Sequence, residues 1–201
     1  MRVKLCFLLF CFSFSFHQKA QDSISVKFKK KEKFWLIPDY TKAQFAGNIG
    51  LASIGIGYKV IHKTLFTELL YGYVPESVSE ANPVHLITLK NTFTILNKDL
   101  GKGYTFSPIT GLTTTLETGN NSFLKVPDVY PDDYYITNAV HFTLFIGALL
   151  HKGFFSDQLF KGIDFYIEVG TVDTYLWYAL TTKEVNFGDV FSSSIGMNFY
   201  F

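Results

Sequence analysis

The chain has 201 residues, with 18 basic and 17 acidic side chains, so its formal net charge at pH 7 is +1. This length suggests one domain, and the near balance of charge excludes a strongly basic nucleic-acid-binding protein. Apolar residues make up 48% of the chain and aromatic residues 18%, which is enough apolar surface for a folded protein and excludes a disordered one.

Residues 1–20 are typical of a secretory signal peptide. Arg2 and Lys4 precede an apolar stretch over 6–16, and Ala20 precedes the expected cleavage point. The apolar stretch is too short for a membrane-spanning helix. Cleavage would remove both cysteines of the chain, so we expect a mature protein without disulfides or thiolate ligands.

Residues 21–43 form a basic and aromatic segment, and the first strand has two candidates in or next to it. Apolar side chains alternate with lysines in Ser23–Lys30, whereas the other candidate is a strand within Tyr40–Leu51 with a tight turn near Gly47. The lysines that precede Phe34 suit a lipid headgroup surface. A solvated leader before the folded domain explains them equally well.

The remaining residues, 44–201, are dominated by the alternation of apolar and polar side chains that is typical of strands. The segment Gln44–Val60 is rich in glycine and shifts phase near Ala52, which indicates a bulge or a tight bend. Six other segments alternate clearly: Thr64–Val74, His85–Leu96, Tyr104–Leu116, Tyr134–Leu149, Leu159–Thr171 and Phe191–Phe201.

In the last of these segments the odd positions are mostly large and apolar, namely Phe191, Ile195, Met197, Phe199 and Phe201, and the even positions are mostly small or polar. This pattern resembles the closing strand of small Gram-negative outer-membrane β-barrel proteins, whose terminal Phe and alternating aromatic residues are recognised by the barrel-assembly machinery. The resemblance is close in the last strand and otherwise covers only the strand pattern. It implies an outer-membrane location and the assembly machinery as a partner.

The composition of the two strand faces favours a barrel over a secreted β-sandwich, which would also alternate. The polar face carries Thr, Ser, Gly and Tyr more often than charged residues, so we expect it to be enclosed. The apolar face is rich in aromatic residues near strand ends, as in a lipid-facing band with aromatic girdles. The prediction is an all-β fold, an antiparallel transmembrane up-and-down β-barrel of eight strands.

Connection lengths predict the orientation of this barrel, because outer-membrane barrels have short periplasmic turns and long external loops. The long connections 75–83, 117–133 and 172–187 are therefore expected outside, and the short ones 61–63 and 97–102 in the periplasm. A barrel of eight strands is filled by side chains, so an aqueous pore is not expected.

Charged residues on the enclosed face are expected to pair with one another. Glu68 and Lys90 lie on neighbouring strands, and folding the hairpin near residue 79 or 80 brings them opposite each other within the register error. An interior salt bridge is the expected role of this pair.

A second polar cluster is predicted in the next-to-last hairpin. Folding it about residue 154 or 155 sets His141 opposite Glu168, with Asp164 and Tyr166 on the same face, and we expect a hydrogen-bonded network in the lumen. Thr143 shares that face as well. A hydroxyl, an imidazole and a carboxylate are also the elements of nucleophilic catalysis.

This alternative is loosely similar to outer-membrane lipid A deacylases, small barrels with a His-x-Ser on one strand and a carboxylate nearby. Here the sequence is His141-Phe142-Thr143, so Thr replaces Ser, and the face is enclosed although a lipid hydrolase needs access to lipid. The resemblance implies His141, Thr143 and Glu168 as the catalytic residues of a membrane hydrolase. The preferred hypothesis is a non-enzymatic barrel.

The expected partners follow from the outer-membrane location: membrane lipid, and lipopolysaccharide at the external loops. Asp128, Asp132 and Asp133 are most simply solvated loop carboxylates, although they could bind a divalent cation. We predict no metal site, no cofactor, no nucleic-acid partner and a monomer.

Overall fold

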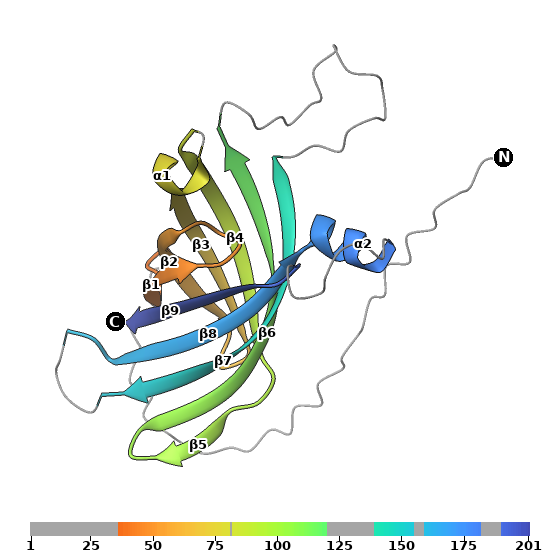
Figure 1. The fold of residues 1–201 in the computed structure, drawn as a ribbon. Helices are drawn as coiled ribbons and strands as arrows, with labels where there is room; N and C mark the ends of the chain where they lie inside the picture. The colour runs from red at the N-terminus through yellow and green to blue at the C-terminus, as the bar shows by residue number, and fades with distance from the viewer. Residues whose placement is uncertain (1–35, 81, 120–138, 155–158, 182–189) are drawn as a thin grey trace, which may run out of the picture. The chain divides into compact units, whose positions relative to one another are not determined.

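The protein folds into a closed eight-stranded antiparallel β-barrel. The computed structural model describes residues 36–80, 82–119, 139–154, 159–181 and 190–201. Within them, nine strand segments and two short helices follow one another along the chain (Figure 1). The strands are β1 (Tyr40–Ala46), β2 (Ala52–Ile61), β3 (Leu65–Val74), β4 (Val84–Thr94), β5 (Lys98–Gly101), β6 (Tyr104–Thr118), β7 (Val140–Gly153), β8 (Gly162–Val172) and β9 (Ser192–Tyr200).

The barrel closes between its first and last strands. β1 pairs with β2 on one side and with β9 on the other, so that Tyr40 lies opposite Tyr200. β4 and the short β5 both pair with β6, so they count as one interrupted strand of the barrel. Every pairing is antiparallel. The predicted up-and-down barrel of eight strands is confirmed.

The first strand is the later of the two predicted candidates. β1 begins at Tyr40, before the boundary expected at residue 44, and Ser23–Lys30 lies outside the described residues. The tight turn follows at 47–51, and Ala46 at the end of β1 has a positive φ, as do Gly47 and Gly50 in the turn. A Cβ on Gly47 would lie 2.8 Å from the Cβ of Ser194, so glycine is required there.

The two ends of the barrel differ in their connections. At one end, here called the turn end, the connections 62–64 and 102–103 are short and the connection 154–161 is longer, and Tyr40 and Tyr200 lie there. At the opposite end, here called the loop end, the longer connections include α1 (Glu76–Ser79) and α2 (Asp173–Thr181). Neither helix in the described part of the chain is long and apolar enough to cross a membrane.

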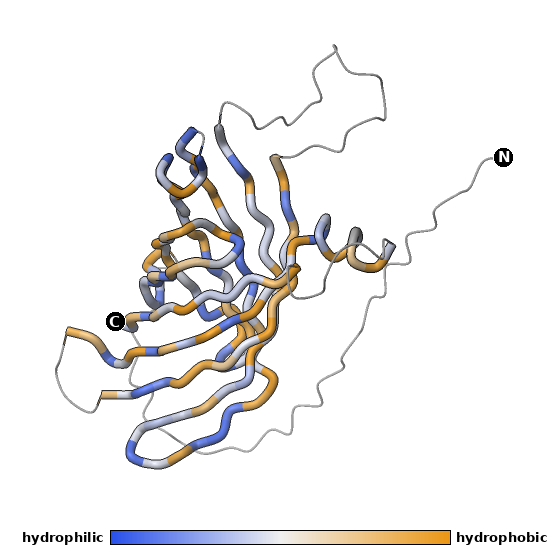
Figure 2. The backbone as a smooth tube through the Cα atoms, in the orientation of Figure 1, coloured by the Kyte–Doolittle hydropathy of each residue, from blue (hydrophilic) through white to orange (hydrophobic). Residues whose placement is uncertain are grey.

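The distribution of polar and apolar side chains is the reverse of that in a soluble protein. Thr, Ser, Lys, Glu and Asp side chains are buried in the lumen, whereas large apolar side chains point outward and are exposed. Figure 2 shows the resulting alternation of hydrophilic and hydrophobic residues along the strands. The enclosed apolar cluster is small and consists of Ile109, Phe145 and Tyr166, with Leu149 packed against it. The predicted enclosure of the polar face is confirmed.

Candidate functional site

The candidate site is the lumen itself, because the chain buries five charged side chains there. They come from four strands, β1, β3, β4 and β8, and each alternates inward with the pleat of its strand. Their exposed fractions lie between 1% and 4% for Lys42, Glu68, Lys90, Asp164 and Glu168. Buried charges are tolerated only when they are paired and hydrogen-bonded. The partners of these residues therefore determine whether the barrel is stable.

The charge of Glu68 is neutralised by side chains of β1. The ammonium group of Lys42 donates to both carboxylate oxygens of Glu68, at 2.8 and 2.9 Å, and the Tyr40 hydroxyl donates to Oε1 at 2.6 Å. The Tyr40 ring occupies the space above Gly57, where a Cβ would lie 2.1 Å from a ring carbon. A glycine on β2 thus allows a tyrosine on β1 to reach the carboxylate on β3.

Lys90 crosses the lumen to a strand on the opposite side. Its ammonium group lies 2.5 Å from Oε2 of Glu168, on β8, and 3.3 Å from the side-chain oxygen of Gln44. The same nitrogen lies 4.4 Å from the centre of the Phe145 ring, which is cation–π range. Tyr166 donates to Gln44 at 3.1 Å and packs over Gly196, so one network links β1, β4, β7, β8 and β9.

The predicted pairing of Glu68 with Lys90 is correct in register but wrong in ion-pair partners. The two residues are direct cross-strand neighbours of β3 and β4. Among the described residues, however, the ion pairs join Glu68 to Lys42 and Lys90 to Glu168. Both lysine side chains are long enough to reach across the narrow lumen, so the closest strand neighbour is not the partner.

His141 does not meet Glu168, contrary to the prediction. The residue opposite Glu168 is Gly147, six positions further along β7, and His141 lies opposite Thr115 on β6. Six residues of a strand span about 20 Å. His141 instead lies near the loop end, with Nε2 3.8 Å from Oε2 of Glu117.

The hydroxyl of the proposed catalytic alternative is also isolated from His141. Thr143 is 4% exposed and lies opposite Thr113, and its hydroxyl has no hydrogen-bond partner in the described part of the chain. Glu168 is bound to Lys90 instead. His141, Thr143 and Glu168 therefore do not form a nucleophile, base and orienting group in this structure.

The histidine that pairs with a buried carboxylate in this hairpin is His151, which sequence reasoning missed. Its Nδ1 lies 2.6 Å from Oδ1 of Asp164, its direct cross-strand neighbour. The other oxygen of Asp164 accepts from the Tyr200 hydroxyl at 2.6 Å and from the Asn198 amide at 2.9 Å. Asp164 is 1% exposed and His151 35% exposed, so the carboxylate is enclosed and the imidazole faces a cavity.

The cavities of the lumen lie at its two ends. A cavity of about 290 Å³ opens at the turn end beside His151, and one of about 580 Å³ at the loop end beside His141. Between them, the cavities around Glu68 and Glu168 measure only about 10 and 20 Å³. The middle of the barrel is therefore filled by side chains, as expected for eight strands.

The outward positions of β9 match the predicted alternation. Ile195 is exposed, as are Phe191 and Phe201, which flank the strand, and Met197 and Phe199 are half-buried, whereas the even positions Ser194, Asn198 and Tyr200 are buried. Asp128, Asp132 and Asp133 lie outside the described residues. Within the described ranges, no group of three or more His, Cys, Asp or Glu side chains could hold a metal ion.

Comparisons with protein-family models, with curated proteins and with solved structures found no match for this chain. The function must therefore be argued from the barrel and its side chains.

Proposed function

We propose that the chain is a membrane-spanning β-barrel of the Gram-negative outer membrane. The observation that carries the proposal is a belt of large, exposed apolar side chains to which every strand of the barrel contributes. One member from each strand illustrates it: Phe45, Ile54, Leu69, Leu89, Leu112, Ile146, Ile167 and Ile195. Soluble monomers rarely expose a contiguous apolar patch larger than a few hundred Å². A hydrocarbon environment accounts for a continuous belt, and the polar lumen is its counterpart.

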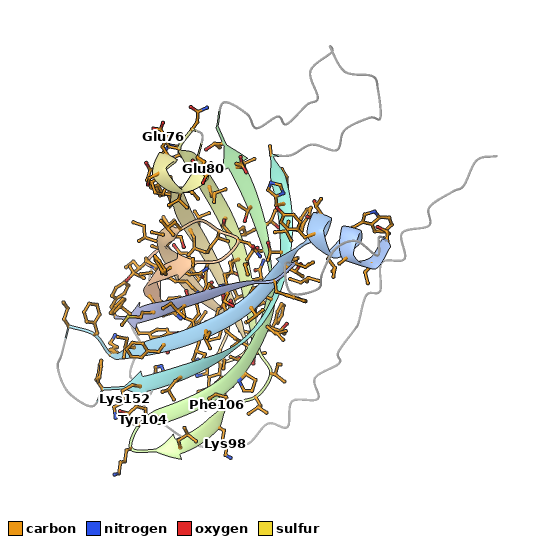
Figure 3. All side chains as sticks on the ribbon, viewed as in Figure 1. Glu76, Glu80, Lys98, Tyr104, Phe106 and Lys152 are labelled. Carbon is orange, nitrogen blue, oxygen red and sulfur yellow. The ribbon has the colours of Figure 1, made fainter. Side chains whose placement is uncertain are left out.

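The ends of the barrel support an orientation with the turn end in the periplasm. Figure 3 shows Lys98 and Lys152 at the turn end, close to Tyr104, and Glu76 and Glu80 at the loop end. Lys152 lies 3.9 Å from the centre of the Tyr104 ring. Amphipathic aromatic rings and lysines suit a bilayer interface. The longer connections at the loop end then face outward, as in other barrels of this kind.

The proposed role is non-enzymatic, with the external loops in contact with lipopolysaccharide or another surface partner. The filled centre of the lumen argues against a pore, and the separation of His141 from Glu168 removes the geometry on which the deacylase alternative depends. Recognition of β9 by the barrel-assembly machinery belongs to the same proposal, because the outward residues of β9 alternate as those of closing strands do.

Cell fractionation tests the proposal directly. Expression of the full chain in a Gram-negative host should place it in the outer-membrane fraction, with a folded form that migrates differently on gels before and after heating. Recovery as a soluble periplasmic protein would contradict the membrane assignment while leaving the barrel fold untouched.

A further inference from the structure

The cavity at the turn end is lined unlike the rest of the lumen. It is bounded by side chains of β2, β3, β4, β6, β7, β8 and β9, by the 62–64 turn and by Asn97, and it measures about 290 Å³. Phe66 and Leu149 form an apolar wall, and the rest of the lining is polar or charged. This size lies at the lower end of the range for small-molecule sites.

The permanent charges that line this cavity are mostly positive. Lys59 and Lys63 line it together with the imidazole rings of His62 and His151, and Asp164 is the one carboxylate among its described lining residues. Both oxygens of Asp164 already accept hydrogen bonds from within the barrel wall, so its charge is partly neutralised before any ligand arrives. Lys59 is held with its ammonium group 4.1 Å from the centre of the Tyr200 ring.

The imidazole ring of His151 lines this cavity. Because Nδ1 is bound to Asp164, Nε2 is the atom left for a ligand, and it has no hydrogen-bond partner among the described residues. Gly153 and Gly162 are cross-strand neighbours beyond the ring, and a Cβ on Gly162 would lie 2.8 Å from Cε1 of His151. Glycine at these two positions leaves room for the imidazole ring.

The connections at the turn end, here called the rim, are also rich in lysine. Lys98, Lys102, Lys152 and Lys161 lie in or next to these connections, with Asp99 as an acidic neighbour. A concave site with an excess of one charge concentrates ligands of the opposite charge. An anion that approaches the turn end is therefore attracted first by the rim and then by Lys63 inside the cavity.

We propose that the turn-end cavity is a binding site for a small phosphate-bearing ligand. Phosphate has oxygens on all sides, which suits the ammonium group of Lys63 in the 62–64 turn, and Nε2 of His151 on β7 can accept a hydrogen bond from a hydroxyl group of the same ligand. Thr105, the cross-strand neighbour of His151, adds a hydroxyl to the same cavity. Phe66 and Leu149 would contact the organic part of the ligand.

Two sources could supply this group, a soluble phosphate monoester or the headgroup of an anionic phospholipid, and the experiment separates them. The full chain is folded in maltoside micelles, which contain no phosphate, with the His151 side-chain signals followed by NMR. Glycerol 3-phosphate is titrated in one arm and phosphatidylglycerol in the other, with uncharged glycerol as the control ligand. Saturable shifts of the His151 signals are expected in at least one arm.

The matched variants are Lys63→Gln, inside the cavity, and Lys98→Gln, on the rim but outside the cavity lining. Loss of one charged hydrogen bond should weaken binding about tenfold in Lys63→Gln, and Lys98→Gln should leave it within about twofold. Both substituted residues are exposed, so heat-modifiable folding should persist in both variants.

Each outcome of the titrations either supports or overturns the proposed phosphate site. Saturation by glycerol 3-phosphate supports a soluble ligand, and saturation by phosphatidylglycerol alone supports a lipid headgroup. No shift in either arm overturns the proposal. Equal weakening in both variants also overturns it, because the attraction would then be a property of the basic rim rather than of the cavity.

Discussion

Replacement of Lys90 by methionine should destabilise the barrel strongly through the carboxylate that it leaves behind. Lys90 is 1% exposed and binds Glu168, which is 4% exposed and has no second ion-pair partner among the described residues. Breaking a buried pair by removing one partner costs about 3–5 kcal/mol. With a urea dependence of about 2 kcal/mol/M, the unfolding midpoint should fall by about 1.5–2.5 M.

The decisive measurement is a double-mutant cycle. Glu168→Gln removes the orphaned charge, so the variant with both Lys90→Met and Glu168→Gln should be more stable than the sum of the two single effects, with a coupling of about 2 kcal/mol or more. Lys98→Met, on the exposed β5, serves as the control and should cost less than about 0.5 kcal/mol. Reversible urea unfolding in micelles, followed by circular dichroism, gives all four free energies. Additive effects of the two single substitutions would refute the reasoning.

Three further predictions test the outer face, the wall and the Asp164 cluster. Ile146 lies at an outward position and is 68% exposed. Ile146→Lys should lower the free energy of unfolding by about 2–4 kcal/mol in a lipid bilayer but change it little in a water-exposed barrel. Unfolding in lipid vesicles therefore tests the membrane proposal. Gly147→Ala should cost about 1–3 kcal/mol because its Cβ would lie 2.3 Å from the Ile167 carbonyl oxygen, whereas Gly153→Ala, with its nearest neighbour at 3.7 Å, should be tolerated in the same urea assay. Asp164→Ala leaves three side chains without their acceptor and should lower the urea midpoint far more than Glu76→Ala on the exposed α1; similar midpoints for the two variants would show that the cluster is dispensable.

The alternation of side chains was sufficient to predict the barrel and the contents of its lumen. Glu68, Lys90, Asp164, Tyr166 and Glu168 are all buried, as their positions in the strand pattern required. This part of the prediction is robust because the side-chain period of a strand is two, so a misplaced strand end does not change which face a residue occupies. The first strand was harder, because Ala46, Gly47 and Gly50 interrupt the pattern with positive φ angles.

Contacts between strands depend on register, and register depends on where the chain turns. The hairpin of β3 and β4 turns close to the expected point, and Glu68 lies opposite Lys90 as predicted. β7 was expected to end at Leu149 but continues to Gly153. Moving the turn of a hairpin by one residue changes the cross-strand partner by two positions. The turn was expected too early in the chain, so the prediction paired Glu168 with His141, whereas its partner in the structure is Gly147.

The signal that could have prevented this error was present in the sequence. His151 follows Leu149 on the same inward face, so the alternation runs past the predicted strand end. Gly153 and Gly162 then bracket the true turn, where glycine is expected beside a bulky inward ring. A strand carried to Gly153 pairs His151 with Asp164 and gives the correct histidine–carboxylate pair.

Partners across the lumen could not have been predicted from strand neighbours at all. Lys90 and Glu168 are 78 residues apart and meet only because the closed barrel brings β4 and β8 to face each other. Closure also decides the charge balance, since two lumen lysines neutralise Glu68 and Glu168 and leave Asp164 to His151. Asp164 thus has no lysine partner among the described residues, and its histidine partner lines the turn-end cavity. A ligand that changes the position of His151 would therefore act on the stability of the barrel through Asp164, which links occupancy of that cavity to folding.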